Sequence, residues 1–290
     1  MVFNHIVYLV FYAISGLLIG LVGGMVGLVL GVVRFPIVVT AETSASIVAG
    51  TNLGISTLGS IAAAIKHYKQ NNIDFHVFKI MAITGSIGAF IGSFLTGFVP
   101  MTFLLCIIGI IVSYEAFILL SKNSKQIKIK IKTKDKEDHF DNNNDDHYGY
   151  DENEIDIKND KIKSKFNTYL TESLIGFAIG FLGGLVGLVL GSIRMPAMIS
   201  ILKLKPKIAV GTNLATASVM GSVGMIGHVL NHNIDYIILM VMGPGAMLGA
   251  YIGAKFTNRF NDTTLKFIIG LVLVIVAISM FWRVFSMVTI

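Results

Sequence analysis

Residues 20–36, GLVGGMVGLVLGVVRFP, are apolar and rich in glycine, and they end in one arginine followed two residues later by proline. Residues 180–196, GFLGGLVGLVLGSIRMP, repeat this stretch with every glycine, the arginine and the proline displaced by 160 positions. Glycine-rich loops can cradle phosphate, but neither copy is followed by the Gly-Lys-Ser/Thr of a nucleotide-binding loop. The stretch is therefore a duplicated structural element rather than a nucleotide site.

The composition indicates that this element lies in a membrane. Of the 290 residues, 54% are hydrophobic and 14% are charged, whereas soluble proteins carry about 25% charged residues. Residues 121–165 alone hold eleven basic and eleven acidic residues. The remaining parts contain repeated apolar runs of 18 or more residues. These runs predict an all-α, multi-pass integral membrane protein of the cell membrane.

The charges and the cysteine exclude several other classes. The net charge of +6 comes from lysines and arginines at the ends of apolar runs, so it favours topology signals over a nucleic-acid surface. The single cysteine, Cys106, excludes an intramolecular disulfide and a cysteine-based metal site. No metal-ligand spacing stands out at His139 or His147 in the charged stretch. We therefore expect no metal and no cofactor.

The repetition extends along the whole chain. At a constant offset of 161, Gly-Thr-Asn-Leu at 50–53 matches 211–214, and Asn-Ile-Asp at 72–74 matches 233–235. Self-similarity of this kind indicates duplicated units. We therefore divide the chain into a first transmembrane repeat at 5–120, a charged cytoplasmic linker at 121–167, and a second transmembrane repeat at 168–286. The linker has too little apolar surface to fold, so we expect it to be disordered.

Each repeat contains four apolar elements. They span 6–39, 44–65, 76–98 and 101–120 in the first repeat, and 170–200, 207–230, 235–256 and 263–286 in the second. The first element of each repeat is longer than the roughly 20 residues of one crossing but shorter than two crossings. Asp74 and Asp235 precede the third elements and are predicted helix N-caps.

The placement of basic residues indicates how the repeats face. If each first element enters the membrane and returns, each repeat crosses an odd number of times and the second repeat is inverted. The basic residues that then share the side of the linker are Lys66, Lys69, Lys79, Lys203, Lys205, Lys207, Lys255, Arg259 and Lys266, with only Arg34 and Arg283 clearly opposite. The positive-inside rule favours this arrangement, with both termini outside.

The glycines allow two interpretations. Gly20-x-x-x-Gly24 and Gly27-x-x-x-Gly31 are small-xxx-small pairs, which are typical of close helix packing in membranes. Alternatively, the first helix of each repeat is broken or re-entrant, and its freed N–H groups face a cavity that attracts an anion. The candidate pathway glycines are Gly23, Gly24, Gly27, Gly31, Gly183, Gly184, Gly187 and Gly191.

Polar residues near these glycines are further candidates. Arg34 and Arg194 carry planar guanidinium groups suited to oxyanions, although contact with lipid phosphates is an alternative role. Four more polar side chains lie early in the second apolar element of each repeat: Thr51, Asn52, Thr212 and Asn213. They either form interhelical hydrogen bonds or line a polar pathway. The candidates for proton coupling are the intramembrane acid Glu115 and two histidines at helix ends, His67 and His228. An interfacial polar role is the alternative for the histidines.

Together these parts resemble the sulfite exporter TauE/SafE family of membrane permeases. The resemblance rests on Gly16–Pro36 and Gly176–Pro196, on 49–53 and 210–214, on the Asn-Ile-Asp turns and on the Gly-Ala-x-x-Gly helices. It covers nearly the whole chain except the linker. The family implies an α-helical permease with duplicated halves that moves small anions such as sulfite or sulfonates, often outward and without ATP. Arg34 and Arg194 depart from it, because an apolar residue is common there.

We therefore expect a secondary exporter of a small anion, such as sulfite, a sulfonate or another organic sulfur compound, that works by alternating access between the repeats. A carboxylate without sulfur is the alternative substrate. An enzyme is disfavoured because neither Ser86 nor Ser222 lies in a Gly-x-Ser-x-Gly elbow. A scaffold that binds a partner through its linker is a third class. The expected partners are the anion and the lipid bilayer, without nucleic acid, and a homodimer is left open.

Overall fold

The computed structural model describes residues 2–39, 44–96 and 154–288, together with ten helical positions between 102 and 121. In these described parts the regular elements are all helices. They are α1 (Val2–Val26), α2 (Gly31–Val39), α3 (Ala45–Lys69), α4 (Phe75–Phe94), α6 (Glu154–Val186), α7 (Gly191–Ser200), α8 (Pro206–Leu230), α9 (Tyr236–Thr257) and α10 (Asp262–Val288).

Seven of these helices are long and apolar enough to cross a membrane. Their candidate spans are Val7–Val26, Ser46–Lys69, Phe75–Phe94, Tyr169–Val186, Pro206–Leu230, Tyr236–Thr257 and Asp262–Ser279. Large apolar side chains such as Trp282, Ile237 and Phe117 are mostly exposed on the outside of the bundle. Hydrocarbon is the solvent that such a surface requires. The protein is a multi-pass membrane protein, as its sequence predicts.

Local signals set the helix boundaries. The carboxylate of Asp74 accepts hydrogen bonds from the backbone N–H groups of His76 and Val77, and Asp235 does the same for Ile237 and Ile238. Both predicted N-caps are therefore confirmed. Pro206 occupies the first turn of α8, where its missing N–H leaves no hydrogen bond unmade.

The charged linker ends earlier than the sequence suggests. We expected disorder across 121–167, but α6 begins at Glu154, so residues 154–167 form the first turns of a long helix. Residues 122–153 lie outside the described part of the chain. Helical hydrogen bonds are made within the helix itself, so a polar sequence can continue a helix beyond the membrane.

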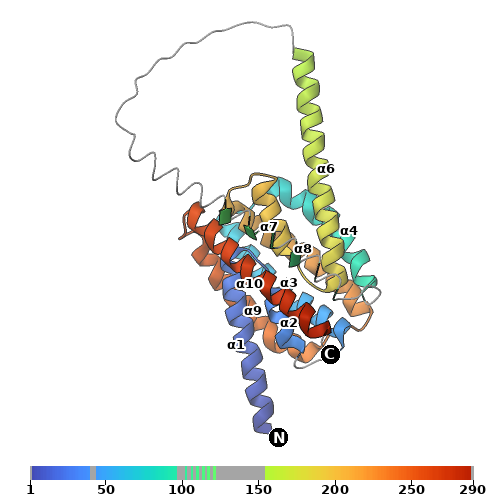
Figure 1. Ribbon diagram of the computed structural model, residues 1–290, viewed down its shortest axis with the longest axis vertical. Coiled ribbons are helices and arrows are strands. Elements are labelled where there is room, and N and C mark those ends of the chain that lie inside the picture. Colours follow the sequence, from blue (N-terminus) through green and yellow to red (C-terminus); the bar gives the residue numbers. More distant parts are fainter. Residues whose placement is uncertain are drawn as a thin grey trace, which may run out of the picture.

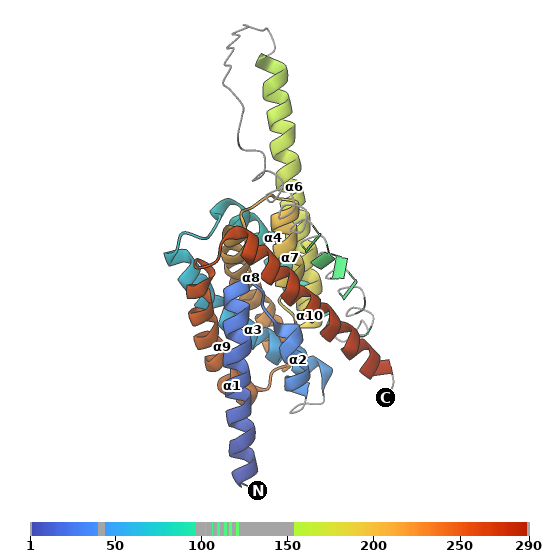
Figure 2. The same ribbon diagram turned by 60° about the vertical axis from the view of Figure 1, so that its left-hand side comes forward.

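The helices of the two halves of the chain interdigitate. α1 packs mainly against α9, α4 packs against α6, and α3 lies between α8 and α9. Of the seven candidate spans, α3 and α8 are the most buried, which places them at the centre of the bundle. Figures 1 and 2 show α1 running upward from the N-terminus and α6 running downward from its polar start. The two glycine-rich helices are therefore antiparallel.

Glycine permits the close approach of these helix pairs. A Cβ atom at Gly20 or Gly24 would overlap the backbone carbonyl of Ala246 or Ala250 in α9. A Cβ at Gly180 or Gly184 would likewise overlap the carbonyls of Gly85 or Ala89 in α4. The packing interpretation therefore holds for this part of each glycine stretch, because lipid supplies no hydrophobic drive between helices and close contact must supply the attraction.

Candidate functional site

Each glycine-rich stretch contains a break in its helix. α1 ends at Val26, and Gly27 then adopts a left-handed backbone with φ of 75°. The N–H of Leu28 turns back to the carbonyl of Gly23 at 3.1 Å. A left-handed residue followed by this hydrogen bond is a Schellman helix end, which glycine adopts without strain. The break therefore follows directly from the position of Gly27.

The second stretch breaks in the same way. Gly187 has φ of 70°, and the N–H of Leu188 donates to the carbonyl of Gly183 at 2.9 Å. The chain then resumes as α2 at Gly31 and as α7 at Gly191. Some of the glycines thus pack helices closely, and others break them.

The two breaks lie against each other at the centre of the protein. A Cβ on Gly31 would come within 3.3 Å of the side chain of Leu188, and a Cβ on Gly191 within 3.4 Å of the backbone nitrogen of Val29. The N-termini of α2 and α7 therefore each adjoin the unwound segment of the other half. Helices that begin inside a membrane bundle present unpaired N–H groups there.

Asparagines from the central helices satisfy the unwound backbone across the two halves. Asn213 Nδ2 in α8 donates to the carbonyl of Gly27 at 2.6 Å, and Asn52 Nδ2 in α3 donates to the carbonyl of Gly187 at 3.4 Å. Irregular backbone at membrane depth is tolerated only where protein or water satisfies it. These predicted pathway residues therefore lie at the breaks, as side chains that hold them in place.

Thr51 and Thr212 lie next to these asparagines but contact a different part of the fold. The hydroxyl of Thr51 accepts the N–H of Asp235 at 2.8 Å, and the hydroxyl of Thr212 accepts the N–H of Asp74 at 2.9 Å. Each threonine thus fixes the start of a helix in the other half of the chain. Neither lines the two cavities described below.

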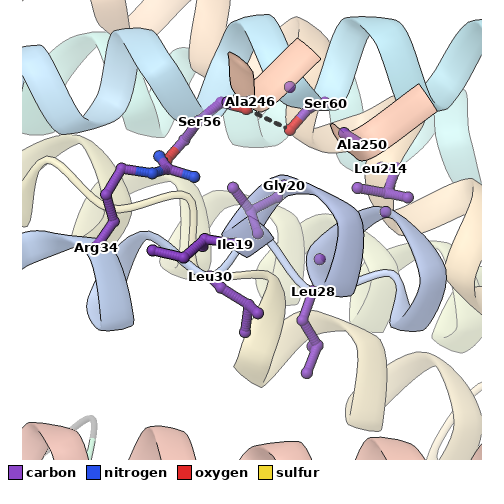
Figure 3. A pocket seen from close by; sticks show the side chains of 14 residues that line it. Ile19, Gly20, Leu28, Leu30, Arg34, Ser56, Ser60, Leu214, Ala246 and Ala250 are labelled. Atoms are coloured by element: carbon purple, nitrogen blue, oxygen red, sulfur yellow. Dashed lines mark hydrogen bonds between the residues drawn. The ribbon is translucent and has the colours of Figure 1, made fainter. Parts of the chain in front are cut away.

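Arg34 lies in α2, and its side chain is 2% exposed. Its Nη1 donates to Ser56 Oγ at 3.0 Å and, at 3.5 Å, to Asn52 Oδ1. Among the described residues its Nε has no hydrogen-bond partner. Figure 3 shows the guanidinium group directed towards Ser56, across from Gly20 and Ile19. Because a buried polar group without a partner is costly, this orientation needs an explanation beyond packing.

A small cavity of about 20 Å³ adjoins Arg34. Besides the arginine, its polar lining side chains are Ser56 and Ser60, whose hydroxyl donates to the carbonyl of Ser56 at 2.7 Å. The rest of the lining is apolar or glycine: Ile19, Gly20, Gly23, Gly24, Leu28, Val29, Leu30, Gly59, Leu214, Ala246 and Ala250. The guanidinium group therefore lies at the edge of a largely apolar chamber, where charge interactions are stronger than in water.

Arg194 lies at the corresponding place in α7 and is fully buried. Its Nε donates to Asn213 Oδ1 at 2.6 Å and its Nη2 to the backbone carbonyl of Asn213 at 2.9 Å. Its Nη1 contacts the sulfur of Met220 at 2.9 Å. A small cavity of about 10 Å³ adjoins it, lined by Met220 and otherwise by apolar residues and glycines. All three nitrogens of Arg194 thus have protein partners.

Comparison with known proteins agrees with this architecture. The sulfite exporter TauE/SafE family matches residues 12–280. The chain belongs to this family. It is a family of transporters, so the protein is a membrane transporter and not an enzyme.

Relatives of this chain include probable membrane transporters of bacteria. The chain is 26% identical to the probable membrane transporter protein YdhB of Bacillus subtilis over 224 residues, which is 75% of this chain and 77% of the relative. It is 28% identical to YunE of the same organism over 109 residues, 38% of this chain and 40% of the relative. A probable membrane transporter protein of Xylella fastidiosa is 21% identical over 247 residues, covering 84% and 83%. No solved structure matches the chain significantly.

The predicted coupling residues of this TauE/SafE transporter have different surroundings. His67 and His228 are buried rather than interfacial, and their Nε2 atoms lie 3.3 and 3.2 Å from the carbonyls of Gly24 and Gly184. These carbonyls belong to the last turns of α1 and α6, so each histidine stabilises a helix end just before its break. Glu115 lies outside the described residues. In the described part of the chain, no three His, Cys, Asp or Glu side chains come together to hold a metal ion.

Sequence reasoning missed several residues of this transporter. It missed Ser56 and Ser60, which follow the predicted residue Asn52 at intervals of four, a spacing that places all three on one face of α3 and that the sequence itself displays. It also missed Glu172, which is 2% exposed and lies 3.6 Å from the half-exposed His76. Glu172 lies close to the polar end of its apolar run, where an acidic residue is common and does not indicate a buried site.

Proposed function

We propose that this transporter is a secondary exporter of a small sulfur oxyanion, such as sulfite or a sulfonate, which binds beside the helix breaks. The observation that carries the proposal is the burial of two arginines that have no acidic partner among the residues that the structure describes. Among the described residues the ion pair found joins His76 to Glu172 and involves neither Arg34 nor Arg194. Burying an unpaired charge is costly, and an anion that binds there would offset the cost.

The chemistry of arginine supports an oxyanion. A guanidinium group stays charged under physiological conditions and presents a planar fork of donors that matches two oxygen atoms of one ligand. Sulfite, sulfonates and carboxylates all present two such oxygens. The family description, sulfite exporter, favours sulfur and outward transport over the carboxylate alternative.

We further propose that the chain consists of two inverted repeats that exchange access to this site. The opposite directions of α1 and α6 and the crossed contacts of the asparagines support the inversion. The proposed domains are the repeats at 5–120 and 168–286. Transporters of this kind bind substrate where broken helices of the two repeats meet, and rocking of one repeat against the other opens the site to each side in turn.

The clustering of basic residues supports a cytoplasmic location for one end of the bundle. The turn after α3 meets the turn after α9 through Asn72 Nδ2 and Asn258 Oδ1, 2.8 Å apart. The start of α8 joins them, with Lys207 Nζ 3.5 Å from the carbonyl of Asn258. The basic residues at the ends of these helices therefore gather at one end, as the positive-inside rule requires of the cytoplasmic side.

Transport into liposomes tests the proposal. The full chain would be reconstituted, and uptake of labelled sulfite would be measured with methanesulfonate, thiosulfate, sulfate and acetate as competitors. We expect sulfite uptake above that of protein-free liposomes, competition by methanesulfonate, and loss of uptake in Arg34→Ala. Arg259→Ala removes an exposed arginine that lies over the ring of Phe256 and serves as the matched control, with uptake unchanged.

Each other outcome has a defined meaning. Uptake that only acetate inhibits would replace the sulfur oxyanion with a carboxylate. A folded wild-type protein that transports none of these anions in either direction would refute the proposed function.

A further inference from the structure

The two cavities are built from corresponding parts of the two halves of the chain. The first is lined by the α1 break, α3, α8 and α9, and the second by the α6 break, α8, α3 and α4. With the offsets found in the sequence, Arg34 corresponds to Arg194, Leu214 to Leu53, and Ala250 to Ala89. Corresponding positions of the two halves therefore line the two cavities, and the cavities differ in the side chains at these positions.

Three adjacent differences change the chemistry of the cavities. At the offset of 161, Ser56 and Ser60 of the first half correspond to Ala217 and Gly221 of the second. Gly59 corresponds to Met220. The first cavity thus has the hydroxyl groups of Ser56 and Ser60, and no side chain at Gly59. The second has no hydroxyl group at these positions and a long thioether side chain that reaches its arginine at 2.9 Å.

The free atoms of the two arginines differ accordingly. On Arg194 the side fork formed by Nε and Nη2 is filled by two oxygen atoms of Asn213, at 2.6 and 2.9 Å. On Arg34 the same fork is open, because both hydrogen bonds that it makes to described residues come from Nη1. The fork of Arg194 therefore binds two oxygen atoms of the protein, whereas the fork of Arg34 binds none among the described residues.

We propose that the transporter has a single anion seat, formed by the open fork of Arg34 with the hydroxyl of Ser56, and that the corresponding place beside Arg194 is filled by Asn213 at the fork and by Met220 at Nη1. This inference rests on the proposed function and states which half of the chain binds the substrate. The ligand is a small oxyanion that presents two oxygens to the fork, as Asn213 does to Arg194. Arg194 is a positioning residue that holds α7 against α8.

The remaining groups of the seat agree with such a ligand. Ser56 Oγ accepts from Arg34, so its own proton is free to be donated to a third oxygen of the anion. Ser60 Oγ–H is already donated to the carbonyl of Ser56, which leaves lone pairs and no donor. The remaining lining side chains are apolar and offer no hydrogen bonds of their own, so an anion in the seat would pair with the guanidinium group and the hydroxyl of Ser56.

Transferring the methionine to the other half provides a direct test. At Gly59 an added Cβ would have its nearest heavy atom at 3.5 Å, an ordinary contact, so the backbone at this position leaves room for the start of a side chain. Its thioether would occupy the Arg34 cavity as Met220 occupies the other. We expect Gly59→Met to abolish sulfite uptake, and Met220→Leu, which keeps the second cavity filled, to retain it within about twofold.

A second variant and a stoichiometry measurement support the test if Gly59→Met fails to fold. Ser56→Ala introduces the residue of the second half and removes one hydrogen bond to a charged ligand, so we expect about tenfold weaker sulfite binding. Titration of the detergent-solubilised full chain with sulfite and with methanesulfonate should give one anion per chain. Folding of each variant is checked by size-exclusion chromatography and thermal unfolding.

The outcomes separate the two proposals. If wild-type protein transports sulfite while a folded Gly59→Met does the same at an unchanged rate, or if two anions bind per chain, the single seat is refuted and the transport function stands. Unchanged sulfite affinity in Ser56→Ala also refutes the seat. If wild-type protein binds and transports no anion of the panel, the proposed function is refuted and the seat with it.

Discussion

Asn213→Ala removes three side-chain hydrogen bonds from the centre of the protein. Asn213 Nδ2 donates to the carbonyls of Gly27 at 2.6 Å and Gly191 at 3.3 Å, and its Oδ1 accepts from Arg194 Nε at 2.6 Å. Asn52 occupies the corresponding position but makes only two contacts, at 3.4 and 3.5 Å. The two alanine variants therefore compare a tightly bonded asparagine with a loosely bonded one in the same kind of environment.

The expected free-energy changes follow from these distances. A hydrogen bond to a charged group contributes about 1.5–3 kcal/mol, and an interhelical bond in a membrane protein contributes about 0.6 kcal/mol on average. Asn213→Ala loses one hydrogen bond to the charged Arg194 and two interhelical bonds to backbone carbonyls, which together contribute about 3–4 kcal/mol. The contacts of Asn52 lie at the limit of hydrogen-bond geometry, so Asn52→Ala should cost about 1 kcal/mol or less.

Unfolding of the purified protein by increasing sodium dodecyl sulfate in mixed micelles would measure both changes. Helix content followed by circular dichroism gives the free energy of unfolding for wild type and for each variant. Equal destabilisation by the two substitutions, or greater destabilisation by Asn52→Ala, would contradict the reasoning, because it would mean that the hydrogen-bond distances do not determine the energies of the two breaks.

Three further predictions use other features of the fold. Gly180→Ala should destabilise the protein by about 1–3 kcal/mol because its Cβ overlaps the α4 backbone, whereas Gly59→Ala should leave the thermal unfolding midpoint nearly unchanged. In a cysteine-free background, Gln70→Cys and Lys205→Cys should react with a membrane-impermeant maleimide from the same side of the membrane; labelling from opposite sides would exclude inverted repeats. His67→Gln keeps a donor for the α1 carbonyl, so we expect normal stability and an unchanged pH profile of uptake; a flattened profile would instead assign proton coupling to this histidine.

The boundaries of the helices could be predicted because the forces that set them act over a few residues. Hydropathy marks each span, the carboxylates of Asp74 and Asp235 accept the first N–H groups of their helices, and Gly27 and Gly187 adopt the left-handed backbone that ends a helix. The start of α6 at Glu154 and the end of α3 at Lys69 lie beyond the apolar elements expected at 170–200 and 44–65, because a polar sequence can continue an existing helix at little cost.

The pairing of the helices could not be predicted from the same information. Apolar periodicity shows that a helix has partners but not which ones, and α1 packs against α9 rather than a helix of its own half. The roles of Thr51 and Thr212 depend on this pairing, since their hydroxyl groups meet backbone from the other half of the chain. Polar residues that look alike along the chain therefore have different roles in the fold.

The sequence by itself determined that the chain has two glycine-broken helices, each followed by one arginine three residues after the last glycine. In the sequence Arg34 and Arg194 are equivalent. The tertiary structure alone distinguished them, because the free donors of a buried arginine depend on which side chains the neighbouring helices place beside it. Met220 and Asn213 bond all three nitrogens of Arg194, whereas Asn52 and Ser56 both bond Nη1 of Arg34 and leave its fork open.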